Sequence, residues 1–359
     1  MLMIVLHHIF VHCATTQLTD PSSIAQLNNG WFCYPVIYER LFIFTAATSW
    51  GPIGNSIFIL ISVYFLACKE PDRIDLAKTA KKLLEQVVFS VLFLIAVSAL
   101  ARQLSGVNYS LETLTSPNTG GWAWFVGYYF VIILIGRLWL NGHLASLDRK
   151  RYATELVCLL AITQFSWTMS LLAGFSDGLS ALAIGLFLYA LGGFIGKFDC
   201  FGRIKAGAII LLMVALSLLM FASYANYVQT AIEMRDPTQA FIQPVETHGN
   251  ASLIAIVISI CLFELFTRIN MPGNAVINFL GASTLMVYLV HDDEFFYSIW
   301  GQTDWITLLH LNYFGFFANL LLVGLMTFGI GVLAYVAYRG AVAGFGRVKH
   351  VFLKPEASA

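Results

Sequence analysis

Three histidines near the start of the chain are the side chains best suited to chemistry. His7 and His8 are adjacent within the apolar run that opens the sequence, and His12 follows one helical turn later. An imidazole at bilayer depth costs free energy and usually serves a function. Because a neutral imidazole can take a proton from a hydroxyl, the pattern predicts a general base inside a membrane, carried by His8 or His7.

Helical spacing separates the three rings. His8 and His12 are four residues apart and share one helix face, whereas His7 points about 100° away. We therefore expect His12 to contact substrate beside the base. An alternative is that His8 only joins helices by a hydrogen bond. No metal is expected, because no acidic or cysteine ligand lies close by in the sequence.

A second group of polar side chains lies in segment 50–66. Its start is loosened by two glycines and a proline, which free backbone groups that must face protein or a water-filled cavity. Asn55, Ser62 and Tyr64 follow in the same segment and are candidate substrate contacts. A packing role for these side chains remains the alternative.

Aromatic rings gather in segment 122–129, at one predicted membrane boundary. Trp124 and Tyr129 are candidates for stacking against a sugar ring. An aromatic belt at the membrane interface would explain the same rings without a ligand.

His291 is followed by three acids, Asp292, Asp293 and Glu294, at the end of another apolar run. An acid there could orient a neighbouring imidazole, so His291 and Asp292 are candidate site residues. The alternative is a helix end that is simply solvated.

The composition places these residues in a membrane protein. Hydrophobic residues make up 58% of the 359 positions, charged residues 11%, and the mean hydropathy is +0.77. A soluble domain carries roughly 25% charged residues. The net charge is zero, so no basic field indicates nucleic acid as a partner. The six cysteines occur singly, which fits neither a disulfide framework nor a zinc ribbon.

A membrane span needs about 20 mainly apolar residues. This length predicts an all-α, polytopic membrane bundle of about ten transmembrane helices with no soluble domain. With the N-terminus inside, 17 of the 20 lysines and arginines fall on the cytoplasmic side, as the positive-inside rule requires. We expect one membrane domain over 1–340, a cytoplasmic tail over 341–359, and both termini in the cytoplasm. The expected spans are 1–16, 50–68, 84–101, 122–140, 155–173, 179–196, 206–224, 250–267, 275–290 and 315–337, with 31–48 as an amphipathic or re-entrant piece.

The first expected span is short. Sixteen residues rise roughly 24 Å, less than a hydrocarbon core about 30 Å thick. No lysine or arginine precedes it. We therefore expect the natural first helix to begin upstream of Met1 and to be truncated here.

Four strings along the chain carry a resemblance to a known family. They are Met-Ile-Val-Leu-His-His at 3–8, Ile-Phe-Ile-Leu-Ile-Ser-Val-Tyr-Phe-Leu at 57–66, the aromatic pairs at 124–125 and 128–129, and Val-Tyr-Leu-Val-His at 287–291. In order and spacing the chain resembles the acyltransferase-3 family, and most closely its surface-polysaccharide O-acetyltransferase type. Members are integral membrane O-acyltransferases with ten spans.

The resemblance implies a function and a set of partners. Acyl-CoA, here acetyl-CoA, would bind from the cytoplasm of a bacterium with its thioester directed toward the first-span histidine. A hydroxyl of a glycan or lipid-linked sugar would approach from outside the plasma membrane, among membrane lipids. Of the basic clusters at 73–82 and 149–151, the residues Arg73, Arg149 and Arg151 would contact the CoA phosphates. Orientation in the membrane explains the same charges without a ligand.

The chain departs from the family pattern at three points. The family's Arg-x10-His pattern would place an arginine before Met1, its Ser-Gly appears as Ser62 and Val63, and an acid of its third motif is replaced near Gly127. A transporter or flippase for a glycan or lipid-linked substrate is the leading alternative function, although such a path would need charged residues in several spans. The oligomeric state is left open.

Overall fold

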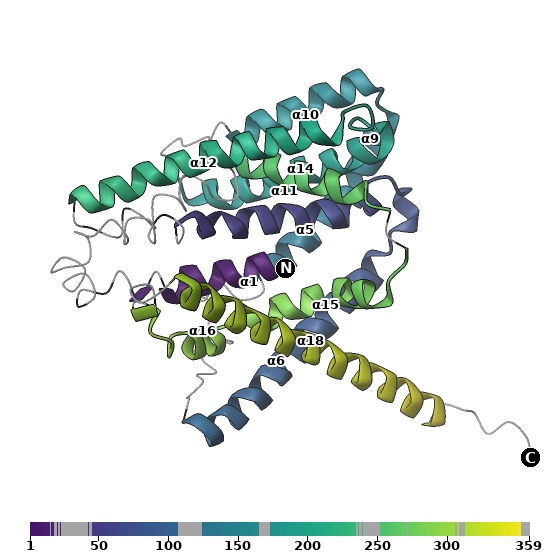
Figure 1. The fold of residues 1–359 in the computed structure, drawn as a ribbon. Helices are drawn as coiled ribbons and strands as arrows, with labels where there is room; N and C mark the ends of the chain where they lie inside the picture. The colour runs from purple at the N-terminus through teal and green to yellow at the C-terminus, as the bar shows by residue number, and fades with distance from the viewer. Residues whose placement is uncertain are drawn as a thin grey trace, which may run out of the picture.

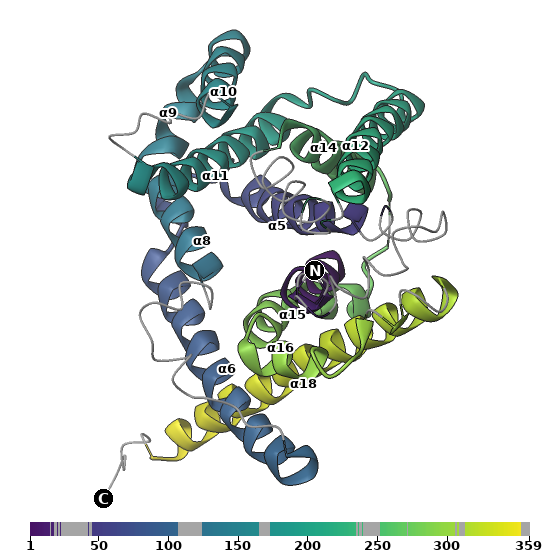
Figure 2. The same ribbon diagram turned by 90° about the vertical axis from the view of Figure 1, so that its left-hand side faces the viewer.

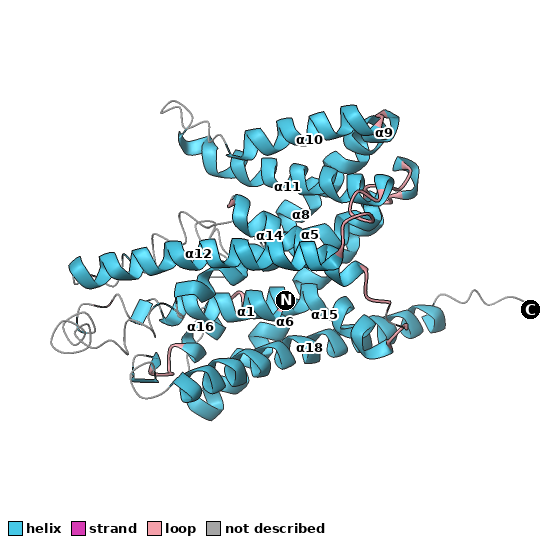
Figure 3. Cartoon of the chain, turned by 45° about the horizontal axis from the view of Figure 1, so that its top comes forward, coloured by secondary structure: helices cyan, strands magenta, loops and turns pink. Residues whose placement is uncertain are grey.

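The computed structural model describes residues 1–14, 45–106, 124–164, 173–234, 252–270, 272–305 and 313–352, together with residues 16, 17, 20, 22, 42, 236, 239, 307 and 308. Within these ranges the chain is helical and contains no strand (Figure 3). The expected amphipathic segment 31–48 and the end of the expected span 155–173 lie largely outside the described residues.

The helices follow one another with few long breaks in the described ranges. The first half of the chain forms α1 (Leu2–Ile9), η1 (Phe10–Ala14), η3 (Ala47–Ser49), α5 (Trp50–Leu66), η4 (Pro71–Arg73), α6 (Leu76–Ser105), α8 (Trp124–Ile135), η5 (Gly136–Leu140), α9 (Asn141–Ser146) and α10 (Arg149–Gln164). The second half forms α11 (Ala173–Phe198), α12 (Ala206–Met234), α14 (Leu253–Thr267), α15 (Ala275–His291), α16 (Glu294–Trp300) and α18 (Tyr313–Phe352).

The length and hydropathy of these helices confirm an all-α, polytopic membrane bundle. Five helical stretches are long and apolar enough to cross a membrane, namely 47–66, 71–104, 124–146, 206–234 and 314–344. The pair α15 and α16 forms one further candidate span that is bent by 80°. Three shorter apolar helices, at 2–14, 182–198 and 253–267, overlap three further expected spans, and α10 covers the described first part of the expected span 155–173.

The helices run alternately up and down the bundle. Figure 1 shows the turns that follow α5, α9, α11 and α14 at the same end as the C-terminus. Helix α18 continues through Phe352 without a break at residue 340, so the expected tail 341–359 begins inside a helix.

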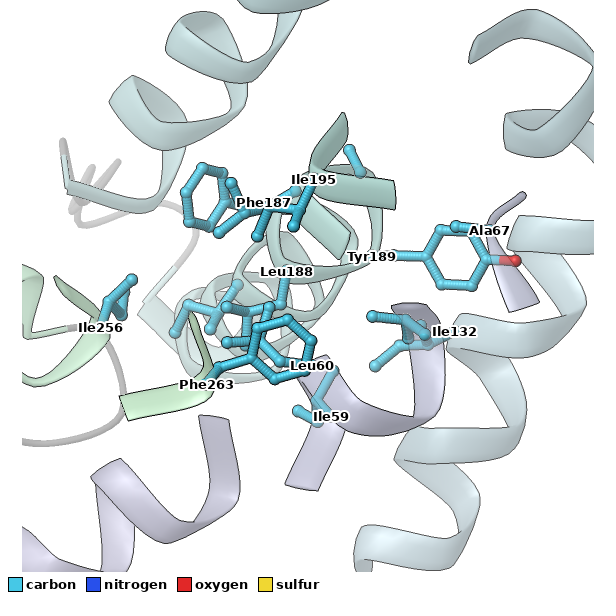
Figure 4. Packing of buried hydrophobic residues seen from close by; sticks show 14 of the residues in the cluster. Ile59, Leu60, Ala67, Ile132, Phe187, Leu188, Tyr189, Ile195, Ile256 and Phe263 are labelled. Carbon is cyan, nitrogen blue, oxygen red and sulfur yellow. The ribbon is translucent and has the colours of Figure 1, made fainter. Parts of the chain in front are cut away.

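Two groups of helices enclose α1. Figure 2 shows α1 between α5 with α11 and α14 on one side, and α15, α16 and α18 on the other. In the first group Leu60 of α5, Leu188 of α11 and Phe263 of α14 pack closely (Figure 4). In the second group Val5 and Ile9 of α1 are fully buried against α15 and α18.

Glycines let α1 approach both neighbours closely. A Cβ built at Gly54 of α5 would lie 2.7 Å from the Ile4 side chain, and one at Gly324 of α18 would lie 2.6 Å from Leu6. Small residues at such contacts allow transmembrane helices to pack with their backbones close together. The first helix is therefore held at a fixed depth and rotation by α5 and α18.

Candidate active site

Residues from opposite ends of the chain meet at His8. Its Nδ1 atom lies 3.1 Å from Nε2 of His291 and 3.2 Å from Oδ1 of Asp292. The two imidazole rings stack with their centroids 5.0 Å apart. Helix α1 supplies the first ring and the end of α15 supplies the other two groups, so the site depends on the packing of these two helices.

A break between α15 and α16 holds the acids at this position. Helix α15 ends at His291, and the two helices meet at 80°. The Asp293 carboxylate caps α16 by accepting a hydrogen bond from the Phe295 backbone N–H at 2.9 Å. Irregular backbone is tolerated inside a membrane only against protein or a water-filled cavity.

The acids at this break are buried. His291 is 0% exposed, Asp292 6% and Asp293 4%. The alternative expectation of a solvated helix end is therefore wrong for these residues, because α16 turns back over the end of α15.

The hydrogen-bond partners assign the protons of the neutral rings. Nδ1 of His291 lies 2.7 Å from the Val287 carbonyl oxygen, which only accepts, so this nitrogen carries the proton and Nε2 of His291 is bare. Nδ1 of His8 faces that bare nitrogen and the Asp292 carboxylate, so it must donate. The proton of neutral His8 then lies on Nδ1, which leaves Nε2 of His8 as the basic nitrogen.

The unprotonated Nε2 of His8 is accessible to a ligand. It makes no hydrogen bond to any other residue that the structure describes, and the His8 side chain retains 15% exposure. A bare imidazole nitrogen with its second nitrogen fixed by an acid is the arrangement of a general base. The cluster can therefore take up a proton from a group that reaches His8.

Tyr297 and His12 extend the cluster outward. The Tyr297 hydroxyl donates to Oδ1 of Asp292 at 2.5 Å. The His12 ring stacks on Tyr297 with a centroid separation of 4.1 Å and lies 5.5 Å from the His8 ring. His12 belongs to η1, a π-helical turn of the kind often found at functional sites. Its side chain is exposed, at the outer edge of the cluster.

His7 points away from the acids, as the helical spacing predicts. Its ring fills the space above Gly51 of α5, where a Cβ would lie 2.3 Å from the ring. Its Nδ1 atom is buried and has no hydrogen-bond partner among the residues that the structure describes. Of the two adjacent histidines, the structure brings only His8 into contact with His291 and Asp292.

The remaining predicted substrate residues lie on neighbouring helices. Asn55 and Trp124 line a small cavity of about 20 Å³. Ser62 donates to the Phe58 carbonyl oxygen at 3.0 Å and also bonds the side chain of Tyr129. Tyr64 packs against Phe263 of α14. None of these side chains has a contact with His8 among those that the structure describes.

The predicted CoA-binding arginines lie at exposed turns. Arg73 pairs with Glu70 at 3.0 Å and Arg151 with Asp148 at 3.7 Å, and both arginine side chains are more than 70% exposed. Arg149 begins α10 and is also exposed. Arg73 follows α5, and Arg149 and Arg151 follow α9. Both α5 and α9 end on the side of the bundle that carries the C-terminus (Figure 1).

Two tyrosines of the site were not predicted. Tyr288 lies four residues before Asp292, close to one turn of helix, and Tyr297 lies five residues after Asp292, beyond the break between α15 and α16. The Tyr288 hydroxyl is buried and interacts with the Asp292 carboxylate. The signal that could have identified Tyr288 is a phenol one turn from an acid inside an apolar run.

The donor atoms of His8, His12 and Asp292 all lie within 4.8 Å of one another. Two imidazoles and a carboxylate are ligands that zinc accepts. The same atoms are explained without an ion by the hydrogen bonds and stacking described above.

Comparison with known proteins identifies the family. A family of acyltransferase domains matches residues 1–336, which is almost the whole chain. No curated protein and no solved structure matches the chain. The matched region includes α1, the break after α15 and every residue of the histidine cluster. The chain therefore belongs to the acyltransferase-3 family and is a membrane acyltransferase.

Proposed function

We propose that the protein transfers an acetyl group from acetyl-CoA to a hydroxyl of a surface or extracellular polysaccharide, or of a lipid-linked glycan. Family membership supports the acyl transfer. The observation that carries the proposal is the open Nε2 of His8, whose opposite nitrogen is held by His291 and Asp292. A transporter or flippase would move its substrate without cleaving a thioester.

The reaction follows from this arrangement. Nε2 of His8 takes the proton of the acceptor hydroxyl as the hydroxyl oxygen attacks the thioester carbonyl carbon. The carbon–sulfur bond breaks, and the CoA thiolate leaves with the proton that His8 returns. The products are an O-acetyl ester and free CoA thiol. An acyl-histidine intermediate would use the same nitrogen as nucleophile and require the hydroxyl in a second step.

Asp292 and His291 support the imidazole during the transfer. When His8 is protonated at both nitrogens, the Asp292 carboxylate 3.2 Å away stabilises the positive charge. The Val287 carbonyl fixes the His291 ring, so His291 keeps a bare nitrogen toward His8. General-base catalysis of this kind contributes about 10²–10⁴-fold to a rate.

The orientation of the bundle supports a two-sided reaction. Lys69 and Arg203 lie in the segments that follow α5 and α11, Arg73 lies in η4, and Arg149 begins α10 after α9. Figure 1 shows that α5, α9 and α11 end on the side of the bundle that carries the C-terminus. By the positive-inside rule this end faces the cytoplasm, here across the plasma membrane of a bacterium. The donor would then enter from this end, and the glycan would approach η1 and α16 at the other.

Substitution of His8 tests the proposal. Purified protein in nanodiscs is given acetyl-CoA labelled in the acetyl group and an extracted bacterial glycan, and label in the glycan and free thiol are both measured. We expect His8→Gln to lower transfer by at least 10³-fold. The matched control is His143→Gln, because His143 lies on α9 and pairs with Glu155 at an exposed surface.

Two results would count against the proposal. Full transfer by His8→Gln would remove His8 from the reaction. Failure of folded wild-type protein to consume any acyl-CoA would favour a transporter or flippase, since neither cleaves a thioester.

A further inference from the structure

One cavity of the bundle is lined by charged, polar and aromatic side chains. It has a volume of about 410 Å³ between α5, α6, α8 and α15. Lys78, Lys82 and Gln86 of α6 form one wall, and Phe58, Tyr129 and Leu285 lie on the others. Cavities of about 300–1,000 Å³ are typical of small-molecule sites.

The two lysines at this cavity are available to a ligand. They are four residues apart, so both ammonium groups lie on one face of α6. Neither has an ion pair or a side-chain hydrogen bond with another residue that the structure describes. Lys81 on the same helix differs, because it pairs with Glu85 at 3.8 Å and does not line the cavity.

The cavity lined by Lys197 differs from the one lined by Lys78 and Lys82 in how its lysine is bonded. Lys197 lines a cavity of about 330 Å³, but its ammonium donates to the carbonyl oxygens of Leu144, Ala145 and Leu147. That charge stabilises the end of α9. Lys78 and Lys82 have no such role in the described structure.

Gln86 provides an independent indication of a ligand. Its side chain is 2% exposed and has a hydrogen bond with the Tyr338 side chain, while its Oε1 atom is buried and has no hydrogen-bond partner among the described residues. A buried acceptor without a partner costs about 1–3 kcal/mol, and more than 90% of buried polar groups are paired. A ligand that brings an N–H group into the cavity would satisfy it.

Aromatic contacts connect the cavity with the histidine cluster. Phe58 and Tyr129 in the cavity wall both contact Phe125, at ring separations of 5.2 and 6.4 Å. Phe125 contacts Tyr288 at 5.4 Å, and Tyr288 contacts His291 at 6.0 Å. These packed rings join the wall of the cavity to His291 of the histidine cluster.

We propose that this cavity binds the acyl donor through its phosphopantetheine arm, an inference that rests on the proposed function. Lys78 and Lys82 bind the phosphates at the cavity mouth, and Gln86 accepts a hydrogen bond from a pantetheine amide N–H. The arm lies along Tyr129 and Phe58 and carries the thioester toward His8. The anionic end of the donor therefore contacts α6 rather than the exposed turns that hold Arg73, Arg149 and Arg151.

The test measures binding of free CoA and of pantetheine to full-length protein in nanodiscs of neutral phosphatidylcholine. We expect the double variant Lys78→Ala and Lys82→Ala to weaken CoA binding by at least tenfold, because bonds to charged groups are stronger than neutral ones. Its affinity for pantetheine, which lacks phosphate, should not change. Gln86→Met should weaken both ligands by about three- to tenfold.

Two control variants separate charge from folding. Lys81→Ala removes a lysine of the same helix and should bind CoA like wild type. The double variant Lys78→Arg and Lys82→Arg keeps the charges and should retain CoA binding within a few-fold. Wild-type affinity for CoA in the double alanine variant, or loss of CoA binding in Lys81→Ala alone, would overturn the proposal.

A lipid headgroup is the other source of a phosphate for these lysines. Nanodiscs that contain phosphatidylglycerol distinguish the two. If anionic lipid raises the melting temperature through Lys78 and Lys82 while CoA affinity is insensitive to both, the lysines hold lipid and the proposal fails.

Binding and transfer measurements distinguish a failure of the cavity assignment from a failure of the proposed function. His8→Gln should bind CoA with wild-type affinity and transfer nothing. If CoA binding depends on the lysines but no acceptor is acetylated, only the proposed function fails. If the double alanine variant transfers acetyl with an unchanged KM for acetyl-CoA, only the cavity assignment fails.

Discussion

Two buried polar clusters in this bundle have opposite characters. In the Asn141 cluster, the amide of Asn141 donates to the carbonyl oxygens of Leu66 and Lys69 and accepts from the Tyr189 hydroxyl. In the His8 cluster, the hydrogen bonds fix one nitrogen of the key ring and leave the other open. A polar side chain whose hydrogen bonds are all made inside the protein joins helices. A ring nitrogen that keeps a free lone pair, as Nε2 of His8 does, can accept a proton.

The backbone around the clusters differs in the same way. Asn141 follows a π-helical turn, but the chain through η5 and α9 remains helical from end to end. The His8 cluster lies where α15 and α16 are broken by 80°. Broken helices are costly in a membrane, so we interpret the break as the feature that places an acid beside the base.

Among changes to the partners of His8 and to the Asn141 cluster, removal of the acid beside His8 has the largest expected effect. Asp292→Asn keeps the shape of the side chain and removes its negative charge, so the imidazolium is no longer stabilised. We expect kcat to fall by about 10²–10⁴-fold, the range of general-base catalysis. Single-turnover transfer with labelled acetyl-CoA measures it, with Glu294→Gln, an exposed acid on α16, as control. A fall of less than twofold would remove the distinction between the two clusters.

The Asn141 cluster should respond in stability and not in rate. Asn141→Leu leaves two carbonyl oxygens and one hydroxyl without partners in a site that is 2% exposed. We expect a loss of about 1–3 kcal/mol, visible as a lower melting temperature in nanodiscs. The folded variant should keep wild-type kcat at low temperature. A selective loss of kcat with an unchanged melting temperature would contradict the structural role.

Tyr297 should have a smaller effect than Asp292. Tyr297→Phe removes the hydroxyl that donates to Asp292 but keeps the ring that stacks on His12. One hydrogen bond to a charged group is worth about 1.5–3 kcal/mol, so we expect a loss of about tenfold or more in kcat. Tyr335→Phe on α18 is a matched control. Equal losses in the two variants would show that Tyr297 acts through general packing.

Metal removal should have the smallest effect of all. The His8, His12 and Asp292 atoms could hold a zinc ion, but the proposed base needs no metal. We expect prolonged treatment with EDTA to leave the transfer rate unchanged within twofold. A loss that added zinc restores would replace the general-base mechanism with a metal-dependent one.

Much of the architecture could be predicted from the sequence. Apolar runs of span length gave the helical membrane bundle, and the cost of an imidazole in a membrane drew attention to His8. The helical spacing also separated His8 from His7, which the structure places on different sides of α1. These predictions depend only on the local spacing of apolar and polar residues and on the free-energy cost of placing a polar side chain in a membrane.

The partners of His8 could not be predicted with the same reasoning. His8 and His291 are 283 residues apart, so their contact depends on how α1 packs against α15. The run of acids after His291 reads equally well as a solvated end, and only the turn into α16 buries it. The cavity at Lys78 and Lys82 depends on four helices together.

The contact between His7 and Gly51 has a consequence for the rate of the reaction. A single methyl group at Gly51 would push the first helix away from α5, because the His7 ring already occupies that space. Displacement of a reacting group by about 1 Å can cost about 10²-fold. In the proposed reaction, the distance between two helix backbones, set by a residue with no side chain, thus tunes proton transfer on the far side of the same helix.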